Sequence, residues 1–136
     1  MVLSEFISVE AVTTEKFKSL KVLIIDDELD ICYLLSGILR QKKLRTSYVN
    51  TLSDAEVALR NDPPSLLFLD NHLPDGFGLD FIHYVESNYP ATKIIMITAH
   101  DNQTDREKAR KEGADFFIGK PFSRELIFKT IEGLSA

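Results

Sequence analysis

Acidic, hydroxyl and lysine side chains stand where four apolar runs of this sequence end. They are Asp26 and Asp27 at the first run, then Asp70, Thr98 and Lys120 at or just after three later runs. Carboxylates without a matching set of Cys or His ligands favour a hard cation such as Mg²⁺ or Mn²⁺. A carboxylate nucleophile, a metal, a lysine and a hydroxyl donor are the groups that phosphoryl transfer uses. The spacing therefore favours that chemistry, provided that the fold brings these residues together.

The apolar runs are the elements that must position these groups. Each is short, apolar or β-branched, and typical of a buried strand. The predicted strands are 21–26, 44–49, 65–70, 93–98 and 115–119. The predicted helices are 28–42, one from 53 to the proline pair at 63–64, one near 79–88, 103–112, and one from 123 onward. This alternation predicts a doubly wound parallel sheet with helices on both faces, a three-layer sandwich that binds ligands at the carboxyl edge of its strands.

Local signals predict helix starts and buried faces. Ser53 and Glu56 form a capping box, with Leu52 and Val57 as its hydrophobic staple, and Ser123 caps the last helix. The apolar stripe of the first helix is Ile31, Leu34, Leu35, Ile38 and Leu39. The inner face of the last helix is Leu126, Ile127, Ile131 and Leu134, with Phe128 off this stripe. Each helix is thus expected to pack on the sheet through one apolar face.

The composition is that of one globular domain. The chain has 136 residues, 44% of them hydrophobic, so it can bury a core without a disulfide or metal. Its net charge of −5 argues against nucleic-acid binding by the domain as a whole, because a phosphate-binding surface needs an excess of Lys and Arg. The single cysteine, Cys32, lies in an apolar helical run, so we expect a small buried residue and a reducing, cytoplasmic location. No run approaches the roughly 18 apolar residues of a membrane span.

Residues 1–20 lie outside the alternating pattern, which occupies 21–134. They predict an N-terminal arm or tail, with a marginal helix that would use Phe6, Val9 and Phe17. Their acidic residues and the lack of a basic start do not fit a secretory signal. The arm would pack against the domain, mediate dimerisation or be disordered, and the sequence leaves these alternatives open.

Residues 21–134 resemble the receiver domain of two-component response regulators, of the chemotaxis-regulator type. The strings that carry the resemblance are IIDDE, LLFLD-x-x-LPDG, IIMITA and KPF, in the family's order and spacing. Each string alone is a weak signal, but together at four strand ends they are specific. The resemblance implies a flavodoxin-like α/β fold, with five parallel strands in the order 2-1-3-4-5 and five helices.

The resemblance also implies a role for each acidic residue. Asp70 would accept the phosphoryl group from a partner's phosphohistidine. Asp27 would bind Mg²⁺ or Mn²⁺ directly and Asp26 would bind it through water. Asp70 and the backbone carbonyl of His72 would be the other protein ligands. Lys120 would neutralise one phosphoryl oxygen.

Further positions match the switch of this family. Thr98 and the backbone amide of Ala99 would hold the remaining phosphoryl oxygens. Phe117 matches the aromatic residue that turns inward when Thr98 moves. The bond between Lys120 and Pro121 would be cis, an isomer that X-Pro bonds tolerate.

His72 and His100 each stand two residues after a site residue. By resemblance, these variable positions influence how long the phosphoryl group lasts. One hypothesis is that the two imidazoles gate the access of water, and that their charge near neutral pH tunes the lifetime. The simpler interpretation is two exposed loop histidines.

The helix over 103–112 is nearly all polar, with Ala109 as its only clearly apolar residue. A helix that buries so little apolar surface is held weakly, and conformational change is drawn from weakly held elements. With strand 115–119 and the last helix, it is predicted to form the switching face, which a downstream partner or a second copy of the chain would bind. Phe128 would add an exposed apolar contact there, or be partly buried.

The predicted function is phosphorelay signalling, with a sensor histidine kinase or a histidine phosphotransfer protein as the donor. We expect a signalling module whose only chemistry is its own phosphorylation and dephosphorylation, and not a turnover enzyme. Two alternatives stay open: a partner-binding module that is not phosphorylated, and a metal-dependent aspartyl-phosphate hydrolase. Such a hydrolase usually has a second aspartate where this chain has His72. The cognate kinase, the output and the oligomeric state do not follow from the sequence.

Overall fold

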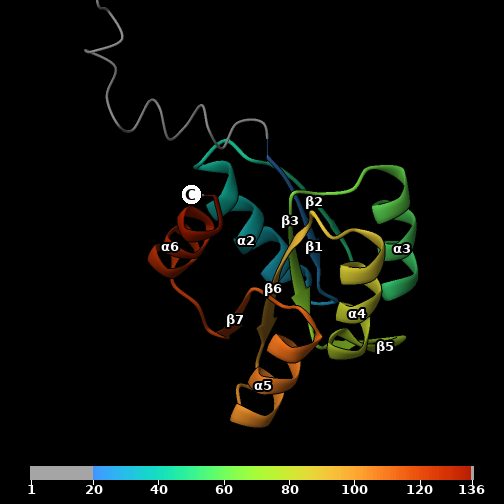
Figure 1. Cartoon of the computed structure of the whole chain (residues 1–136). Coiled ribbons are helices and arrows are strands. Elements are labelled where there is room, and N and C mark those ends of the chain that lie inside the picture. The colour runs from blue at the N-terminus through green and yellow to red at the C-terminus, as the bar shows by residue number, and fades with distance from the viewer. Residues whose placement is uncertain (1–19, 136) are drawn as a thin grey trace, which may run out of the picture.

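The computed structural model describes residues 20–135 and contains one five-stranded parallel sheet between two layers of helices (Figure 1). The strands are β1 (Lys21–Ile25), β2 (Arg45–Val49), β3 (Leu66–Asp70), β6 (Lys93–Thr98) and β7 (Phe116–Gly119). The helices are α2 (Leu29–Arg40), α3 (Leu52–Asn61), α4 (Gly78–Asn88), α5 (Gln103–Glu112) and α6 (Arg124–Ser135). The order β2-β1-β3-β6-β7, with every pairing parallel, confirms the predicted fold class. The predicted arm lies outside the described residues except for Leu20.

Two hydrophobic cores hold the layers together. Helices α2 and α6 cover one face of the sheet, and α3, α4 and α5 cover the other (Figure 1). Successive strand residues point to opposite faces, so Ile24 packs in the first core and Ile25 in the second, both fully buried. This burial on both sides is why the strand sequences are continuous apolar runs, and it fixes the carboxyl edge as the place where polar residues begin.

The outer flanks of α2 and α6 depart from the predicted stripes. Leu34 is 53% exposed and Leu126 is 41% exposed, although both were expected to face the core. Cys32 is fully buried as expected and shares the inner face of α2 with Leu35. Phe128 is half-buried against the first core, with the Lys42 ammonium 4.7 Å from its ring centroid. Helical spacing shows which apolar residues share one face of a helix. It does not show which edge of that face a neighbouring element covers.

The start of α3 is set by Thr51 and not by the predicted cap Ser53. The Thr51 hydroxyl accepts a hydrogen bond of 3.0 Å from the Asp54 amide, and the helix begins at Leu52. The Asp75 carboxylate accepts hydrogen bonds from the Leu52 and Ser53 amides, at 2.9 Å each. A carboxylate that lies 22 residues away in sequence therefore completes the helix terminus. In α6, by contrast, Ser123 accepts from the Leu126 amide at 3.1 Å, as predicted.

A small hairpin follows β3 and was not predicted. It consists of β4 (His72–Leu73) and β5 (Gly76–Phe77), joined by Pro74 and Asp75. Pro, Asp and Gly in succession signal a tight turn, but the flanking pairs are too short for a strand pattern. The hairpin presents Asp75 to α3 and leads directly into α4.

Helix α5 spans the predicted residues, and Ala109 is its only buried residue. It begins after Asn102, whose side chain accepts from the Asp105 amide at 2.9 Å, and it ends at Gly113, which has a φ of 119°. Among residues 20–135, no helix is both long enough and apolar enough to cross a membrane.

Two glycines in helices predict opposite effects of an added methyl group. Gly37 lies on the exposed side of α2, and a Cβ there would meet nothing within 4 Å. Gly37→Ala should raise the free energy of unfolding by about 0.5–1 kcal/mol, because alanine is the better helix former. A Cβ at Gly78 would lie 2.1 Å from the Asp70 carbonyl oxygen. Gly78→Ala should therefore lower the free energy of unfolding by about 1–3 kcal/mol.

Urea unfolding of both variants measures these changes, with equal m-values as the sign that only stability has changed. Equal effects of the two substitutions would contradict the close packing described for Gly78.

Candidate functional site

The carboxyl edge of the sheet brings four of the predicted site residues together. Asp26 follows β1, Asp70 ends β3, Thr98 ends β6 and Lys120 follows β7. The Lys120 ammonium nitrogen lies 2.9 Å from Asp26 Oδ2 and 3.5 Å from Asp70 Oδ1. Its side chain is only 8% exposed, and both carboxylates are buried. A buried lysine thus joins the ends of three strands that are distant in sequence.

Glu28 is a member of this cluster that was not singled out from the sequence. Its carboxylate accepts a hydrogen bond of 3.2 Å from the Lys120 ammonium, although its side chain is 56% exposed. The signal was present, because Glu28 directly follows Asp26 and Asp27. It appeared to be an ordinary acidic residue at the start of a helix, and only the position of Lys120 distinguishes it.

The four acidic residues of this cluster fit a divalent cation. Asp26, Asp27, Glu28 and Asp70 each place one carboxylate oxygen within 4.8 Å of the others. Asp26 Oδ2 is buried and pairs with the Lys120 ammonium at 2.9 Å. Buried carboxylates that share one ammonium, beside an exposed Asp27, are suited to a hard ion that retains some of its waters.

Burial and mutual repulsion change the protonation of the cluster. Burial, and then the neighbouring Asp26, raise the pKa of Asp70 to about 7 despite the nearby Lys120. Burial also raises the pKa of Asp26, although the Glu28 amide donates to Asp26 Oδ1 at 2.9 Å. Burial alone would lower the pKa of Lys120, but its hydrogen bonds and the surrounding carboxylates raise it, so the lysine is charged. One ammonium therefore does not fully balance the acidic groups around it.

Polar contacts from the surrounding loops hold the two buried aspartates in place. The Asn50 amide and the Cys32 thiol both donate to the Asp26 carbonyl, at 2.8 Å and 3.3 Å. On the other side, the Asn71 carboxamide oxygen accepts from the Leu79 amide at 3.0 Å. These contacts link the ends of β1 and β3 to neighbouring elements, and no sequence pattern distinguishes Asn50 or Asn71 from other loop asparagines.

Thr98 and Lys120 are linked through the backbone. The Lys120 amide donates to the Thr98 carbonyl at 2.8 Å, and the Thr98 hydroxyl accepts from the His100 amide at 3.2 Å. Thr98 is 1% exposed, whereas the following Ala99 is exposed. The bond between Lys120 and Pro121 is cis.

Phe117 is connected to the loop after Thr98 through an arginine. The Arg106 guanidinium lies 4.9 Å from the centroid of the Phe117 ring. It also donates two hydrogen bonds to the Asp101 carboxylate, at 2.5 Å and 2.8 Å. This pairing keeps the pKa of Asp101 below its ordinary value. The sequence indicated Phe117 but neither Arg106 nor Asp101, because their contact depends on how α5 packs.

His72 and His100 are exposed but in contact with each other. Their ring centroids lie 4.7 Å apart, and the His72 ring also meets Phe77 edge to face at 5.6 Å. The hairpin and the loop after β6 are thereby joined by aromatic contacts beside Asp70. The two histidines are therefore more than isolated loop residues.

The model of the response regulator receiver domain family matches residues 22–132. The chain therefore belongs to this family. The receiver shares 39% identity over 111 residues with response regulator protein PilR of Pseudomonas aeruginosa, which covers 79% of this chain and 25% of that protein. It shares 32% identity with the phosphate regulon transcriptional regulatory protein PhoB of Escherichia coli, covering 79% of this chain and 48% of that protein.

Solved receiver structures have the same fold. The beryllofluoride-activated NtrC4 receiver domain dimer superimposes with a TM-score of 0.80 and 36% identity, covering 84% of this chain and 94% of that chain. The receiver domain of NtrX from Brucella abortus gives a TM-score of 0.79 with 30% identity over 84% and 97% of the two chains. The chain spans about a quarter to a half of the curated relatives that it matches first. It is a receiver of the two-component type, which supports phosphoacceptor signalling over the alternatives that the sequence left open.

The raised pKa of Asp70 predicts how its replacement changes stability with pH. An unfolded chain ionises this carboxyl near its ordinary pKa of 3.8, but the folded receiver holds the proton to about 7. Stability present at low pH is therefore lost as pH rises between these two values. Asp70→Asn stays neutral, so it should stabilise the receiver relative to wild type by on the order of 1–3 kcal/mol more at pH 8 than at pH 5.

Denaturant unfolding at the two pH values, with EDTA present, measures this difference. Asp30→Asn changes an exposed carboxylate on α2. Its free energy of unfolding should differ from that of wild type by the same small amount at both pH values. A pH-independent effect of Asp70→Asn would show that the Asp70 carboxyl is not held protonated in the fold.

Proposed function

We propose that this receiver accepts a phosphoryl group on Asp70 and transmits the change through Thr98 and Phe117. The observation that carries the proposal is the buried Lys120 ammonium, which lies between the Asp26 and Asp70 carboxylates. A lysine in this position pairs with a carboxylate at rest and is close enough to pair with an oxygen of a phosphoryl group on Asp70. The donor is a phosphohistidine of a sensor kinase or phosphotransfer protein, and the receiver works in the cytoplasm.

In the proposed reaction, one Asp70 carboxylate oxygen attacks phosphorus. The bond between phosphorus and the donor's imidazole nitrogen breaks, and that nitrogen keeps the electron pair. Asp70 must be ionised to attack, so positive charge near it favours the reaction by lowering its pKa. Lys120 supplies part of that charge from within the chain.

The acidic cluster is proposed to hold Mg²⁺ or Mn²⁺. The donor set is Asp27 and Asp70, with Asp26 acting through water and the His72 carbonyl as a further ligand. When bound, the cation offsets the negative charge of the carboxylates and of the phosphoryl oxygens. The close spacing of the acidic ligands, which share a single Lys120 ammonium, supports this proposal.

Thr98 and the Ala99 amide are proposed to hold the other phosphoryl oxygens. To do so, the Thr98 hydroxyl would give up its present contact with the His100 amide and turn towards Asp70. The Phe117 ring packs against Arg106. Arg106 is paired with Asp101, which lies in the loop after Thr98. The shared contacts support a path from the phosphorylation site to the face formed by α5, β7 and α6.

That α5–β7–α6 face is the proposed output surface, for a downstream partner or a second copy of the receiver. Relatives of this chain are transcriptional regulators, and one similar receiver was solved as a dimer. The receiver itself is proposed to signal and not to turn over a substrate. Residues 21–134 are proposed to form this module.

Phosphorylation should depend on Asp70 and on the acidic cluster. With Mg²⁺ and acetyl phosphate, or with beryllofluoride, wild type should form a stoichiometric adduct that mass spectrometry or fluorine NMR detects. Asp70→Asn should form none, and Asp27→Asn should slow the reaction by on the order of a hundredfold, because it removes a proposed metal ligand.

Asp30→Asn is the matched control, since it removes a nearby exposed carboxylate outside the cluster. An adduct that persists in Asp70→Asn would place the acceptor elsewhere. The lack of any adduct in wild type would leave a partner-binding module as the better function.

The paired histidines should slow the loss of the phosphoryl group. The contact between the His72 and His100 rings supports a cover that hinders the approach of water to Asp70. The His72→Ala, His100→Ala double variant should therefore lose its phosphoryl group several-fold faster than wild type.

The rate is followed by the decay of labelled phosphoprotein at about pH 6, 7 and 8. His83→Ala, on the exposed side of α4, controls for the loss of a histidine elsewhere. Rates equal to wild type across this range would leave the two histidines as ordinary loop residues.

A further inference from the structure

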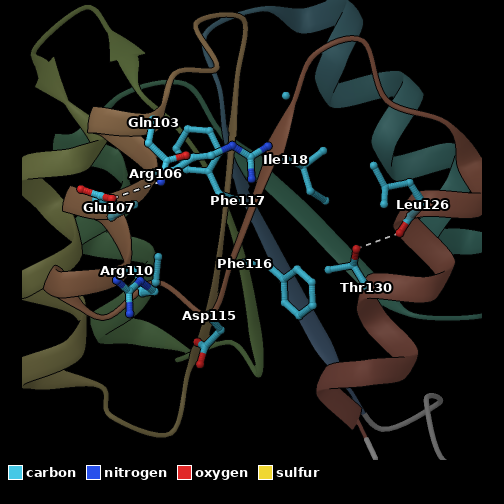
Figure 2. Close-up of a pocket in the computed structure, with 13 residues that line it drawn as sticks. Gln103, Arg106, Glu107, Arg110, Asp115, Phe116, Phe117, Ile118, Leu126 and Thr130 are labelled. Carbon is cyan, nitrogen blue, oxygen red and sulfur yellow. Dashed lines mark hydrogen bonds between the residues drawn. The ribbon is translucent and has the colours of Figure 1, made fainter.

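The Arg106 side chain connects three segments on the α5–β7–α6 face. From α5, its guanidinium donates two hydrogen bonds to the Asp101 carboxylate, at 2.5 Å and 2.8 Å. The same guanidinium lies 4.9 Å from the centroid of the Phe117 ring on β7. Arg106 and Phe117 both line a groove of about 570 Å³ between α5, β7 and α6 (Figure 2). We call Asp101, Arg106 and Phe117 the arginine bracket.

Asp101 lies directly on the backbone of β7. A Cβ atom added at Gly119 would be only 2.8 Å from Asp101 Oδ2 and 3.1 Å from Asp101 Cβ. Gly119 is the sheet partner of Thr98 and directly precedes Lys120. The loop after β6 therefore folds back onto the strand that leads to the lysine of the site, and the Asp101 side chain contacts that strand.

Phe117 lies between the core and the guanidinium. Its ring is partly buried and packs against the second hydrophobic core. Arg106, whose side chain is 42% exposed, covers the ring from the solvent side. A guanidinium over an aromatic face is attracted by the electrons of the ring. Because Arg106 is also fixed to Asp101, an inward turn of Phe117 would break this ring contact.

The ion pair of the bracket has good geometry but is partly exposed. Two N–H groups of one guanidinium on the two oxygens of one carboxylate is the strongest arrangement of this pair. The pairing keeps the pKa of Asp101 below its ordinary value and raises the pKa of Arg106, so both groups are charged at neutral pH. Water still reaches both side chains and screens the pair. The bracket is therefore expected to change an equilibrium several-fold and not by orders of magnitude.

The bracket begins one residue after the contact that Thr98 would have to release. The Thr98 hydroxyl accepts a hydrogen bond of 3.2 Å from the His100 amide, and Asp101 is the next residue. In the reaction proposed above, the Thr98 hydroxyl leaves this contact and turns towards Asp70. The loop that would have to rearrange is thus the loop that Arg106 connects to α5 and β7.

We propose that the arginine bracket restrains the receiver in its resting conformation and thereby weakens the binding of the phosphoryl group. The inference rests on the proposed phosphorylation of Asp70 and names the residue that sets how readily the receiver switches. A ligand that binds only one of two conformations binds more tightly when that conformation is more populated. Contacts made only at rest lower that population. Arg106 is thus a positioning residue, which acts through Phe117 and the loop after Thr98 without touching the phosphoryl group.

Titration of the full-length protein with beryllofluoride in the presence of Mg²⁺, followed by fluorine NMR, measures this restraint. Arg106→Met removes the charge but keeps a long side chain that favours a helix. It should bind beryllofluoride about three- to tenfold more tightly than wild type, the size expected for a partly exposed ion pair with a ring contact. Arg110→Met is the matched control, one turn further along α5 in the same groove, and should bind like wild type.

A double-variant cycle distinguishes the bracket from a general loosening of α5. Asp101→Asn keeps the size of the side chain against Gly119 but weakens the pair with Arg106, so it should also tighten binding. The Asp101→Asn, Arg106→Met double variant should bind about as tightly as the stronger single variant, because both changes remove the same contact. Independent loosening would instead multiply the two effects. Arg106→Lys keeps the charge without the paired hydrogen bonds and should lie between wild type and Arg106→Met, which also provides the test if Arg106→Met does not fold.

Binding by the Arg106 variants that is equal to or weaker than that of wild type would overturn the inference. So would effects that multiply in the double variant. In both cases wild type still forms the adduct, so the proposed phosphorylation of Asp70 is unaffected. The lack of any adduct in wild type would instead contradict the proposed phosphorylation, and the inference with it.

Discussion

The ion pairs of Lys120 are the interaction on which the carboxyl edge depends. Three carboxylates, from Asp26, Glu28 and Asp70, surround one ammonium group that is nearly excluded from solvent. A buried charge without a partner costs several kcal/mol, so the Lys120 ammonium stabilises the ionised forms of Asp26 and Asp70 at this close approach. Because Lys120 follows β7, Asp26 follows β1 and Asp70 ends β3, this balance requires these strands of the sheet to be in register. Local sequence can place each charge at a strand end, but only the assembled sheet can pair them.

The single charge of Lys120 does not balance all of the carboxylates around it, and this imbalance connects the structure to the function. Asp70 retains a pKa raised by burial and by Asp26, and burial raises the pKa of Asp26 as well. A site in this condition gains stability from any further positive charge, because such charge relieves the repulsion between carboxylates. The features that make the resting site electrostatically unfavourable are therefore those that favour a cation.

The surroundings of the site differ in how firmly they are held. The ends of β1 and β3 are fixed by Asn50, Asn71 and the tightly packed Gly78. The loop after Thr98 and helix α5 have fewer anchors, since Ala109 is the only buried residue of that helix. Arg106 connects this loop to Phe117 through one salt bridge and one ring contact. Arg106 therefore links the loop after Thr98 to the α5–β7–α6 face, whereas Asn50, Asn71 and Gly78 anchor the opposite side of the site.

The strand order came from the resemblance to the receiver family. The sequence by itself determined the five strands, their alternation with helices and the positions of Asp26, Asp70, Thr98 and Lys120 at strand ends. These follow from local transitions, because an apolar run that ends in a polar residue marks the edge of a buried parallel sheet. Only the tertiary structure decided that Glu28 pairs with Lys120, that Asp75 completes the start of α3, and that the histidine rings meet. It also decided that Leu126 is exposed while Phe128 packs on the core. Helical periodicity specifies the direction in which a side chain points from its own helix. The residues that bury that side chain, or pair with it, come from segments far away in the chain.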